Sequence, residues 1–357
     1  MLIKPKKIYT TLISFTLILL SILLLSMNSN NNIGTHNLKG MNISCQTWGY
    51  EWATPEMKES LYELRDLGLN SFTFHPYARI SNKGRIKYTN SLDQEHITVP
   101  LTWAKELNMK VMLKPHLAYW GSRFSWRGDI NFNSEKEWNI FFEDYKNWIL
   151  VQAQIAEKYK ADIFCIGVEY KHSLRFEQKW REIISAIRGV YSGKLTYGAN
   201  WDTYANVKFW DDLDYVGIQA YFPIVDKKNP TEAELNSGWD LVLNQLKDFS
   251  TQKDKSIIFT ELGYNNSEFA GKEPWSSHES KSDAGKMTQQ RCLNIALEKT
   301  KSKEFIAGVF LWKWFPEIKK FSWHQNFNLQ SKENKQIITK AWKNNNLNLN
   351  TDSKIGK

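Results

Sequence analysis

The stretch Asp162-Ile163-Phe164-Cys165-Ile166-Gly167-Val168-Glu169 decides the fold of this chain. It is a short apolar run of β-branched and aromatic residues that ends on an acidic side chain. Such a run predicts a buried strand. The carboxylate at its end is expected at the rim of the core, where it meets water or a substrate.

Seven further runs of the same kind are distributed along the chain after residue 39. They cover residues 41–45, 71–75, 110–114, 194–198, 215–219, 256–259 and 306–311. Most of them are separated by stretches with helical periodicity, which indicates repeated βα units and a parallel sheet. Eight strands with interleaved helices predict a single (β/α)8 TIM barrel in the α/β class.

Four helices are predicted between these strands, over residues 55–67, 134–159, 231–249 and 283–300. The first begins with Thr54-Pro55, an N-cap followed by proline at the first helical position, and ends at Gly68. The second begins at Ser134 with Glu137 three residues later, which is a capping-box pattern. The connection after the fifth strand is short and carries no clear helix signal.

The predicted domain organisation has three parts. Residues 37–325 form the barrel, a length near the about 250 residues typical of this fold. Residues 326–357, rich in Asn and Lys, are expected to form a polar tail. Residues 1–36 are expected to lie outside the fold, as an export signal or an anchor with a linker.

The amino terminus has the pattern of an export segment. Lys4, Lys6 and Lys7 precede an apolar run over residues 8–27. Its length is near the ~20 residues that span a bilayer, and no small-residue cleavage site is evident, so a removed signal peptide and an uncleaved membrane anchor both remain open. The positive flank predicts a barrel outside the cytoplasm, whether periplasmic, secreted or membrane-anchored.

Several classes of function have no support in the sequence. Cys45, Cys165 and Cys292 are expected to be buried and unpaired, because two lie in non-neighbouring strands and one in a helix. No Cys/His cluster has metal-ligand spacing and no phosphate-binding loop occurs, so we expect neither metal nor cofactor. The net charge is +9, but the Lys and Arg residues are scattered along the chain and often alternate with Asp and Glu. This distribution favours a solvated surface over nucleic-acid binding. We expect a monomer.

A second strand also closes on a glutamate, in Phe259-Thr260-Glu261-Leu262-Gly263-Tyr264. Glu169 and Glu261 therefore end the fourth and seventh strands and face each other across the mouth of the predicted barrel. Two such carboxylates are the groups that glycosidic bond cleavage needs, one as acid and one as nucleophile or base. Judged alone, Glu169 has an alternative interpretation as a salt-bridge partner of Lys171 or Arg175.

Aromatic side chains gather at the strand ends. The chain has 16 Trp, and the aromatic share is 14%. Flat pyranose faces stack on such rings, while sugar hydroxyls bind polar side chains. The predicted sugar-contacting residues are Trp48, His75, Lys114, His116, Asn200, Trp201 and Trp312.

The pair of glutamates resembles the large clan of retaining (β/α)8 glycosidases. Four stretches together resemble glycoside hydrolase family 113, whose characterised members include β-1,4-mannanases: residues 167–170, 195–202, 209–223 and 259–264. The resemblance implies that Glu169 is the acid/base and Glu261 the nucleophile. It also implies that Tyr221 hydrogen-bonds the nucleophile and that Trp312 forms the floor under the reacting sugar.

Two details of this resemblance leave alternatives open. Val168 occupies the place where many clan members have Asn, so the contact to the sugar 2-hydroxyl falls to His116 or Asn200. Glu51 is expected to contact substrate or to act electrostatically at a helix start.

The sequence therefore predicts an exported retaining β-glycoside hydrolase that acts on β-1,4-mannan-type glycans by double displacement. The alternative is a non-catalytic carbohydrate-binding barrel at the cell surface, which the intact glutamate pair disfavours. Because rim carboxylates contribute little to core burial, we expect that removing either one leaves the fold stable.

Overall fold

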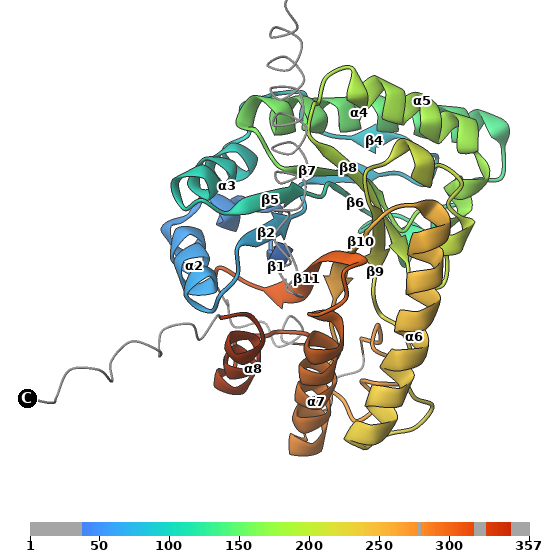
Figure 1. Cartoon of the computed structure of the whole chain (residues 1–357). Coiled ribbons are helices and arrows are strands. Elements are labelled where there is room, and N and C mark those ends of the chain that lie inside the picture. Colours follow the sequence, from blue (N-terminus) through green and yellow to red (C-terminus); the bar gives the residue numbers. More distant parts are fainter. Residues whose placement is uncertain (1–37, 278–279, 281, 318–325, 344–357) are drawn as a thin grey trace, which may run out of the picture. The chain divides into compact units, whose positions relative to one another are not determined.

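The computed structural model describes residues 38–277, 280, 282–317 and 326–343. Eight parallel strands form a closed barrel in the order β1-β11-β10-β9-β8-β7-β5-β2 (Figure 1). The strands are β1 (Leu38–Ile43), β2 (Ser71–Phe74), β5 (Lys110–Leu113), β7 (Ile163–Val168), β8 (Lys194–Asn200), β9 (Val216–Gln219), β10 (Ile257–Leu262) and β11 (Ile306–Trp314). All eight predicted strands are present, which confirms the (β/α)8 barrel.

Helices surround this ring of strands. They are α2 (Pro55–Asp66), α3 (Glu95–Glu106), α4 (Glu135–Tyr159), α5 (Glu177–Arg188), α6 (Glu232–Lys253), α7 (Asp283–Thr300) and α8 (Lys332–Trp342). The four predicted helices correspond to α2, α4, α6 and α7. Between β8 and β9 the chain forms the 3-10 turns η4 (Tyr204–Asn206) and η5 (Trp210–Asp212), as the weak signal there predicts.

Side-chain caps begin several of these helices. Ser134 accepts a hydrogen bond from the backbone N–H of Glu137 at the start of α4. The reciprocal capping box occurs at α6, where Thr231 and Glu234 each cap the backbone of the other. These contacts satisfy amide groups that have no partner inside the helix.

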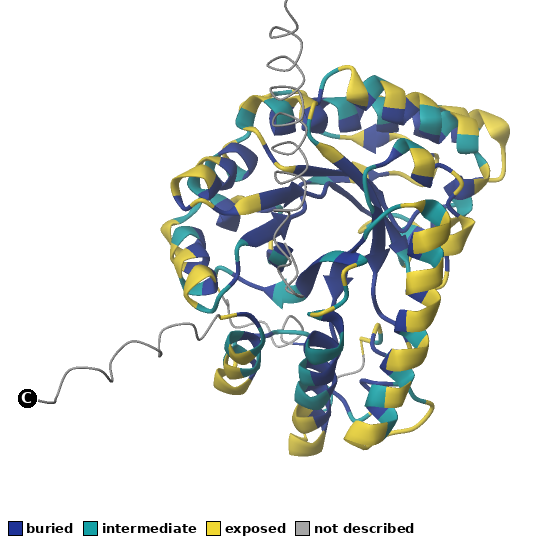
Figure 2. Cartoon of the chain, viewed as in Figure 1, coloured by how far each residue is buried: buried dark blue, intermediate teal, exposed yellow. Residues whose placement is uncertain are grey.

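The core lies between the barrel and the inner faces of the helices, which are buried while their outer faces are exposed (Figure 2). Aromatic side chains fill much of this layer. The Tyr145 hydroxyl of α4 donates to the Ile166 carbonyl of β7 at 2.7 Å, and Trp180 of α5 is fully buried. These contacts fix the strand that carries Glu169 against its covering helices.

A small sheet extends the carboxyl ends of two barrel strands. It has the order β4-β3-β6, with β3 (Tyr77–Ile80), β4 (Ile86–Lys87) and β6 (His116–Ala118). β3 follows β2 and pairs in parallel with β6, which follows β5. The sheet holds the loop after residue 118 above one side of the barrel mouth.

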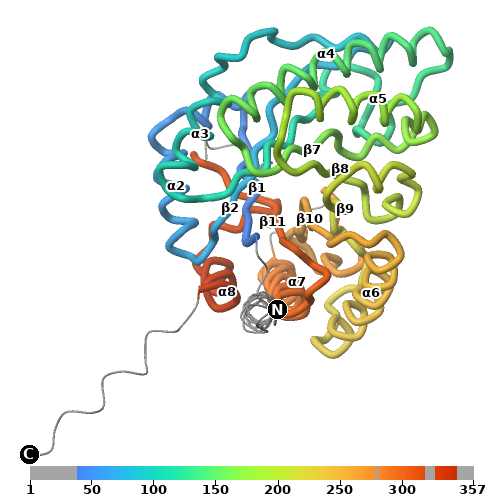
Figure 3. The backbone as a smooth tube through the Cα atoms, turned by 45° about the horizontal axis from the view of Figure 1, so that its top comes forward, coloured from blue at the N-terminus to red at the C-terminus, as the bar shows by residue number. Residues whose placement is uncertain are grey.

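The predicted polar tail requires a correction at its amino-terminal end. α8 packs against α7, and Asn334, Ile338 and Trp342 are buried. Lys39 Nζ of β1 donates to the Trp342 carbonyl at 2.9 Å. α8 therefore belongs to the barrel wall, where both views place it between α7 and α2 (Figure 3).

The predicted export segment and residues 344–357 of the predicted tail lie outside the described residues. Among the helices that are described, none is both long and apolar enough to cross a bilayer. Cys45, Cys165 and Cys292 are buried and free, as predicted.

Candidate active site

The two strand-end glutamates line one cavity at the carboxyl ends of the barrel strands. Glu169 follows the last residue of β7, and Glu261 lies near the end of β10. The cavity has a volume of about 760 Å³. Its other lining residues are Tyr119, Ser125, Trp126, Arg127, Asn200, Trp201, Asp202, Tyr221, Trp275, Ser276, Ser277, Trp312 and Phe327.

Glu261 is held at both carboxylate oxygens. Lys114 Nζ lies 2.6 Å from Oε1, and the Tyr221 hydroxyl donates to Oε2 at 2.7 Å. Glu261 is 3% exposed and Lys114 is fully buried. An ammonium and a phenol aimed at separate oxygens fix the orientation of this carboxylate.

Burial also acts on the two partners of Glu261. It lowers the pKa of Lys114, an effect that the negative charge of Glu261 partly offsets. It raises the pKa of Tyr221 well above its usual value, so the phenol stays protonated and donates.

Glu169 has a different environment. Its Oε2 accepts a hydrogen bond from Trp126 Nε1 at 2.8 Å and lies 3.3 Å from the Arg127 guanidinium. Burial is the main cause that raises the pKa of Glu169, and the nearby charge of Glu261 adds to it, while Arg127 and Trp126 act in the opposite direction. Glu169 is thus adapted to hold a proton more readily than an exposed carboxyl.

The backbone at Glu169 is unusual. Its φ of 62° is left-handed, a conformation that costs a side-chain-bearing residue about 1–2 kcal/mol. Its N–H donates to the Gly198 carbonyl at 2.8 Å, and its own carbonyl accepts from Lys171 at 2.7 Å. Neighbouring chain segments therefore hold this conformation in place.

Aromatic rings line the cavity. Trp312 of β11 lies with its ring 5.5 Å from Lys114 Nζ. Trp201 stacks on Trp275 with ring centroids 5.2 Å apart. Asn200 Nδ2 donates to Asp202 at 2.8 Å, which leaves the amide oxygen of Asn200 to accept from a ligand.

A model of Glycoside Hydrolase Family 113 matches residues 44–332 of the sequence. The chain belongs to glycoside hydrolase family 113. No match is found among curated proteins.

Solved structures agree with this family 113 assignment. A family 113 β-1,4-mannanase complex matches with a TM-score of 0.73 and 25% identity, covering 87% of this chain and 99% of that one. The family 113 β-mannanase AaManA from Alicyclobacillus acidocaldarius matches with a TM-score of 0.72 and 23% identity, covering 87% and 98%. A β-glucuronidase from Ruminococcus gnavus shares the fold alone, at 12% identity and a TM-score of 0.56, covering 86% of this chain and 50% of that one.

Most of the predicted site residues of this family 113 barrel meet at the cavity. Glu169, Glu261, Tyr221, Trp312, Asn200 and Trp201 all line it. The glycoside hydrolase fold thus brings together residues that are far apart in the sequence.

Three predicted substrate contacts need correction because their side chains are buried. His75 and Lys114 are 0% exposed and His116 is 1% exposed. The two imidazoles stack on each other with centroids 4.7 Å apart, and burial lowers the pKa of each well below its usual value. They pack beneath the site as neutral rings, and of the two residues proposed for the 2-hydroxyl contact only Asn200 borders the cavity.

Two other predicted residues, Trp48 and Glu51, do not line the cavity. Trp48 does not line the cavity, because it packs edge-on against Trp120 at a centroid distance of 5.6 Å. Glu51 is 5% exposed and accepts hydrogen bonds from the Gln46 N–H and the Thr47 hydroxyl. It lies in the first turn of the 3-10 helix η1 (Tyr50–Ala53), at the kind of helix start where an electrostatic role is predicted, and its hydrogen bonds fix the loop after β1.

The partners of Glu169 are not among the site residues that the sequence predicts. Trp126 and Arg127 come from the long loop between β6 and α4, at the 3-10 turn η2 (Arg127–Asp129). An aromatic-basic pair in a loop at the catalytic face was the available signal. Arg127 takes the place of Lys171 or Arg175 as the ion-pair partner of Glu169.

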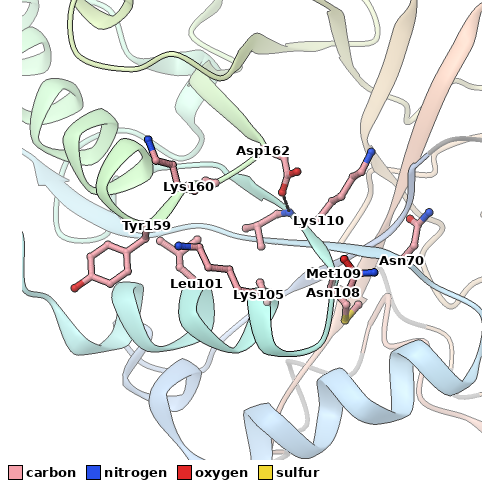
Figure 4. Close-up of a pocket in the computed structure, with 12 residues that line it drawn as sticks. Asn70, Leu101, Lys105, Asn108, Met109, Lys110, Tyr159, Lys160 and Asp162 are labelled. Carbon is pink, nitrogen blue, oxygen red and sulfur yellow. Dashed lines mark hydrogen bonds between the residues drawn. The ribbon is translucent and has the colours of Figure 1, made fainter.

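A second cavity of about 570 Å³ lies at the opposite end of the family 113 barrel (Figure 4). It is lined by residues at the amino ends of β5 and β7, with Lys105, Lys110 and Lys160 around it. Its one lining carboxylate, Asp162, accepts from the Val111 N–H at 2.9 Å. Barrel enzymes carry their chemistry at the other face, so this cavity is not the catalytic site.

We searched the described part of the chain for clusters of side chains that could bind a metal ion. No group of three or more His, Cys, Asp or Glu side chains there has an arrangement that holds a metal ion.

Proposed function

We propose that this protein is a retaining β-glycoside hydrolase that cleaves β-1,4-mannan-type chains by double displacement. One observation supports it most directly: two buried carboxylates share one cavity, and their partners hold them differently. Glu261 is bound by an ammonium and a phenol, whereas burial favours the protonated form of Glu169. Such a difference assigns the base-like and acid-like roles in a carboxylate pair.

In the first step Glu261 attacks the anomeric carbon while Glu169 transfers its proton to the leaving glycosidic oxygen. The carbon–oxygen bond of the glycoside breaks as the glycosyl–Glu261 ester forms. In the second step Glu169 takes a proton from water, the resulting nucleophile attacks the same carbon, and Glu261 leaves.

The electrostatics of the pair support this change of role. The charge of Glu261 raises the pKa of Glu169. Once Glu261 is esterified that charge is gone, so the pKa of Glu169 falls and the group becomes a base when a base is needed.

The proposed substrate class, β-mannan, is supported by the solved structures that this chain resembles. The solved family 113 enzymes that cover most of this chain are described as a β-1,4-mannanase and a β-mannanase. The aromatic rings that line the cavity fit a pyranose chain of this kind.

The stereochemistry of the product tests the mechanism. We expect the first sugar released from a β-mannan oligosaccharide to keep the β configuration, because two displacements restore it. Proton NMR, recorded before mutarotation, reads the anomer directly. An α-configured first product would exclude double displacement.

A substrate panel separates the enzyme from the carbohydrate-binding alternative. Turnover is compared on β-mannan, glucomannan, β-glucan and xylan oligosaccharides, together with binding by calorimetry. Hydrolysis of the mannans supports the proposal, whereas tight binding without hydrolysis of any glycan favours a binding barrel.

We also propose that the barrel acts outside the cytoplasm. The support is the basic and apolar sequence of residues 4–27. Cell fractionation with N-terminal sequencing of the mature protein tests export and distinguishes a cleaved signal from an anchor.

A further inference from the structure

Lys114 contacts the nucleophile of the proposed reaction but does not border the cavity. Lys114 Nζ lies 2.6 Å from Glu261 Oε1, and its side chain has no exposure to water. A second contact, at 3.3 Å, joins Nζ to the carbonyl of Thr260, the residue before Glu261. The ammonium is therefore fixed relative to Glu261 by the same strand that carries this carboxylate.

The two oxygens of Glu261 face different sides of the site. Oε2 accepts a hydrogen bond from the hydroxyl of Tyr221, which lines the cavity. Oε1 is bound by Lys114, which is fully buried and does not line the cavity. A sugar in the cavity therefore approaches Glu261 from the side of Oε2, while Oε1 points away from the cavity toward Lys114.

The charge of Lys114 acts in opposite directions on the two displacements. In the first, Glu261 gives up its negative charge, so Lys114 exchanges a charged acceptor for the neutral carbonyl of an ester, which binds an ammonium less strongly. In the second, the charge returns to Glu261 as the sugar leaves. The ammonium therefore stabilises the transition state of this second step more than it stabilises the ester.

The surroundings of Lys114 make it dependent on Glu261. Burial lowers the pKa of Lys114, and the charge of Glu261 offsets part of this effect. Within the described part of the chain, no other carboxylate lies within ion-pair distance of Nζ. A buried ammonium with a single counter-ion favours the state in which that counter-ion is charged.

We propose that Oε2 of Glu261 is the atom that attacks the sugar, and that Lys114 holds Oε1 through both displacements and accelerates the second. The inference rests on the proposed function and assigns its steps to individual atoms. In the first step the bond from Oε2 to the anomeric carbon forms while the glycosidic bond breaks. In the second step the oxygen of water bonds to that carbon, its proton passes to Glu169, and the electron pair of the broken ester bond returns to Glu261. Lys114 acts through Glu261, so it is a positioning residue.

The second displacement can be measured separately from the first. A 2-deoxy-2-fluoro-β-mannosyl fluoride reacts readily in the first step, because fluoride leaves easily, and its 2-fluoro group then slows hydrolysis of the ester. After excess reagent is removed, activity returns as the ester is hydrolysed. The half-life of this return is a first-order quantity, so it does not depend on the amount of folded enzyme.

Lys114→Met removes the charge and keeps a side chain of similar shape. It should lengthen the half-life about ten- to hundredfold, the effect of losing a charge-assisted hydrogen bond. Lys114→Arg keeps the charge and should reactivate faster than Lys114→Met. An unchanged half-life for Lys114→Met overturns the inference, and so does equal slowing by Met and Arg, because packing and not charge would then be responsible.

Met112→Leu is the matched control, because Met112 is a fully buried residue two positions earlier on β5. Its half-life should equal that of the wild type. A crystal structure of the trapped wild type tests the atomic assignment. We expect the ester at the oxygen next to Tyr221, with Lys114 on the other oxygen, and an ester at the oxygen bound by Lys114 overturns the assignment.

Failure of the proposed function has a different signature. If no fluorinated glycosyl fluoride adds mass to the wild-type protein, double displacement is overturned and the inference with it. If an adduct forms but its half-life is the same with and without Lys114, the inference alone is overturned. If only another sugar series traps the enzyme, the mannan assignment is overturned, and the half-lives in that series still test Lys114.

Discussion

Lys114 and Glu261 form a buried ion pair whose two members depend on each other. Lys114 Nζ also lies 3.3 Å from the Thr260 carbonyl, and its side chain has no exposure to water. The expectation that either glutamate can be removed without consequence for folding therefore needs revision. Glu261 is the counter-ion of a charge inside the barrel.

We predict that Glu261→Ala lowers the free energy of unfolding by about 3–5 kcal/mol, because it leaves the Lys114 ammonium buried without a partner. Combining Lys114→Met with Glu261→Ala should restore much of this loss, since the charge is then absent. Urea unfolding of Glu261→Ala, the double variant and the wild type measures both effects. Coincident unfolding curves for Glu261→Ala and the wild type would show that the pair contributes nothing.

We also predict that Arg127 influences the pH above which activity declines. Its positive charge lowers the pKa of Glu169, and Glu169 must be protonated to act as the acid. Removing the charge with Arg127→Gln raises that pKa, so the decline of kcat/KM on the alkaline side should move to higher pH. A pH–rate profile reads the shift.

Arg175→Gln is the matched control for this profile. Arg175 stacks on Trp138 and Phe176 at 4.9 and 4.8 Å and has no contact with Glu169. Its alkaline limit should coincide with that of the wild type. A shift to lower pH in Arg127→Gln would assign the limit to a different group.

At the scale of elements, α8 completes the wall of the barrel. The backbone of Trp342 and Lys343 lies so close to Gly68 that an added Cβ would be 2.7 Å from the Lys343 nitrogen. Gly68 also has a φ of 97°, so glycine is needed there both for its conformation and for its size. The end of α2 and the end of α8 are thus fitted to each other.

We predict that Trp342→Ala lowers the free energy of unfolding by about 3–5 kcal/mol, because it removes a large side chain that is 2% exposed. Lys340→Ala, on the exposed side of the same helix, should have little effect. Chemical denaturation compares the two. Equal stability of both variants would mean that α8 is not part of the cooperative fold.

Some elements of this barrel are predictable from the sequence and others are not, for physical reasons. Strands were recognised because buried parallel strands are short and apolar, and α2 because its ends are marked by Thr54-Pro55 and Gly68. α3 was missed because it contains Pro100 and begins without a side-chain cap. α8 was missed because its surrounding Asn and Lys residues conceal three buried positions spaced by four.

At the scale of the whole molecule, some residues of the site are predictable from the sequence and others are not. Residues at strand ends, such as Glu169, Glu261 and Tyr221, were predictable because the barrel fixes where each strand ends. Trp126 and Arg127 were not, since a long loop carries them back to the cavity. The pairing of Lys114 with Glu261 depends on closure of the barrel, which brings β5 and β10 into contact through its interior.

We predict that a chain starting at residue 37 keeps the kcat of the full chain on soluble oligosaccharides. The described residues that line the cavity all lie between Tyr119 and Phe327. Steady-state kinetics of the two proteins test it. A large loss of kcat with intact folding would place part of the active site in the first 36 residues.

At residue 169 the left-handed backbone favours glycine, whereas the reaction requires a carboxyl group. A glycine there would adopt the same φ without strain and relieve the burial of a carboxyl group, so the barrel would gain stability as it lost its acid. The single substitution Glu169→Gly would therefore convert this hydrolase into a more stable protein that binds glycans without cleaving them. Glutamate at this position therefore supplies the acid for turnover and lowers the stability of the barrel.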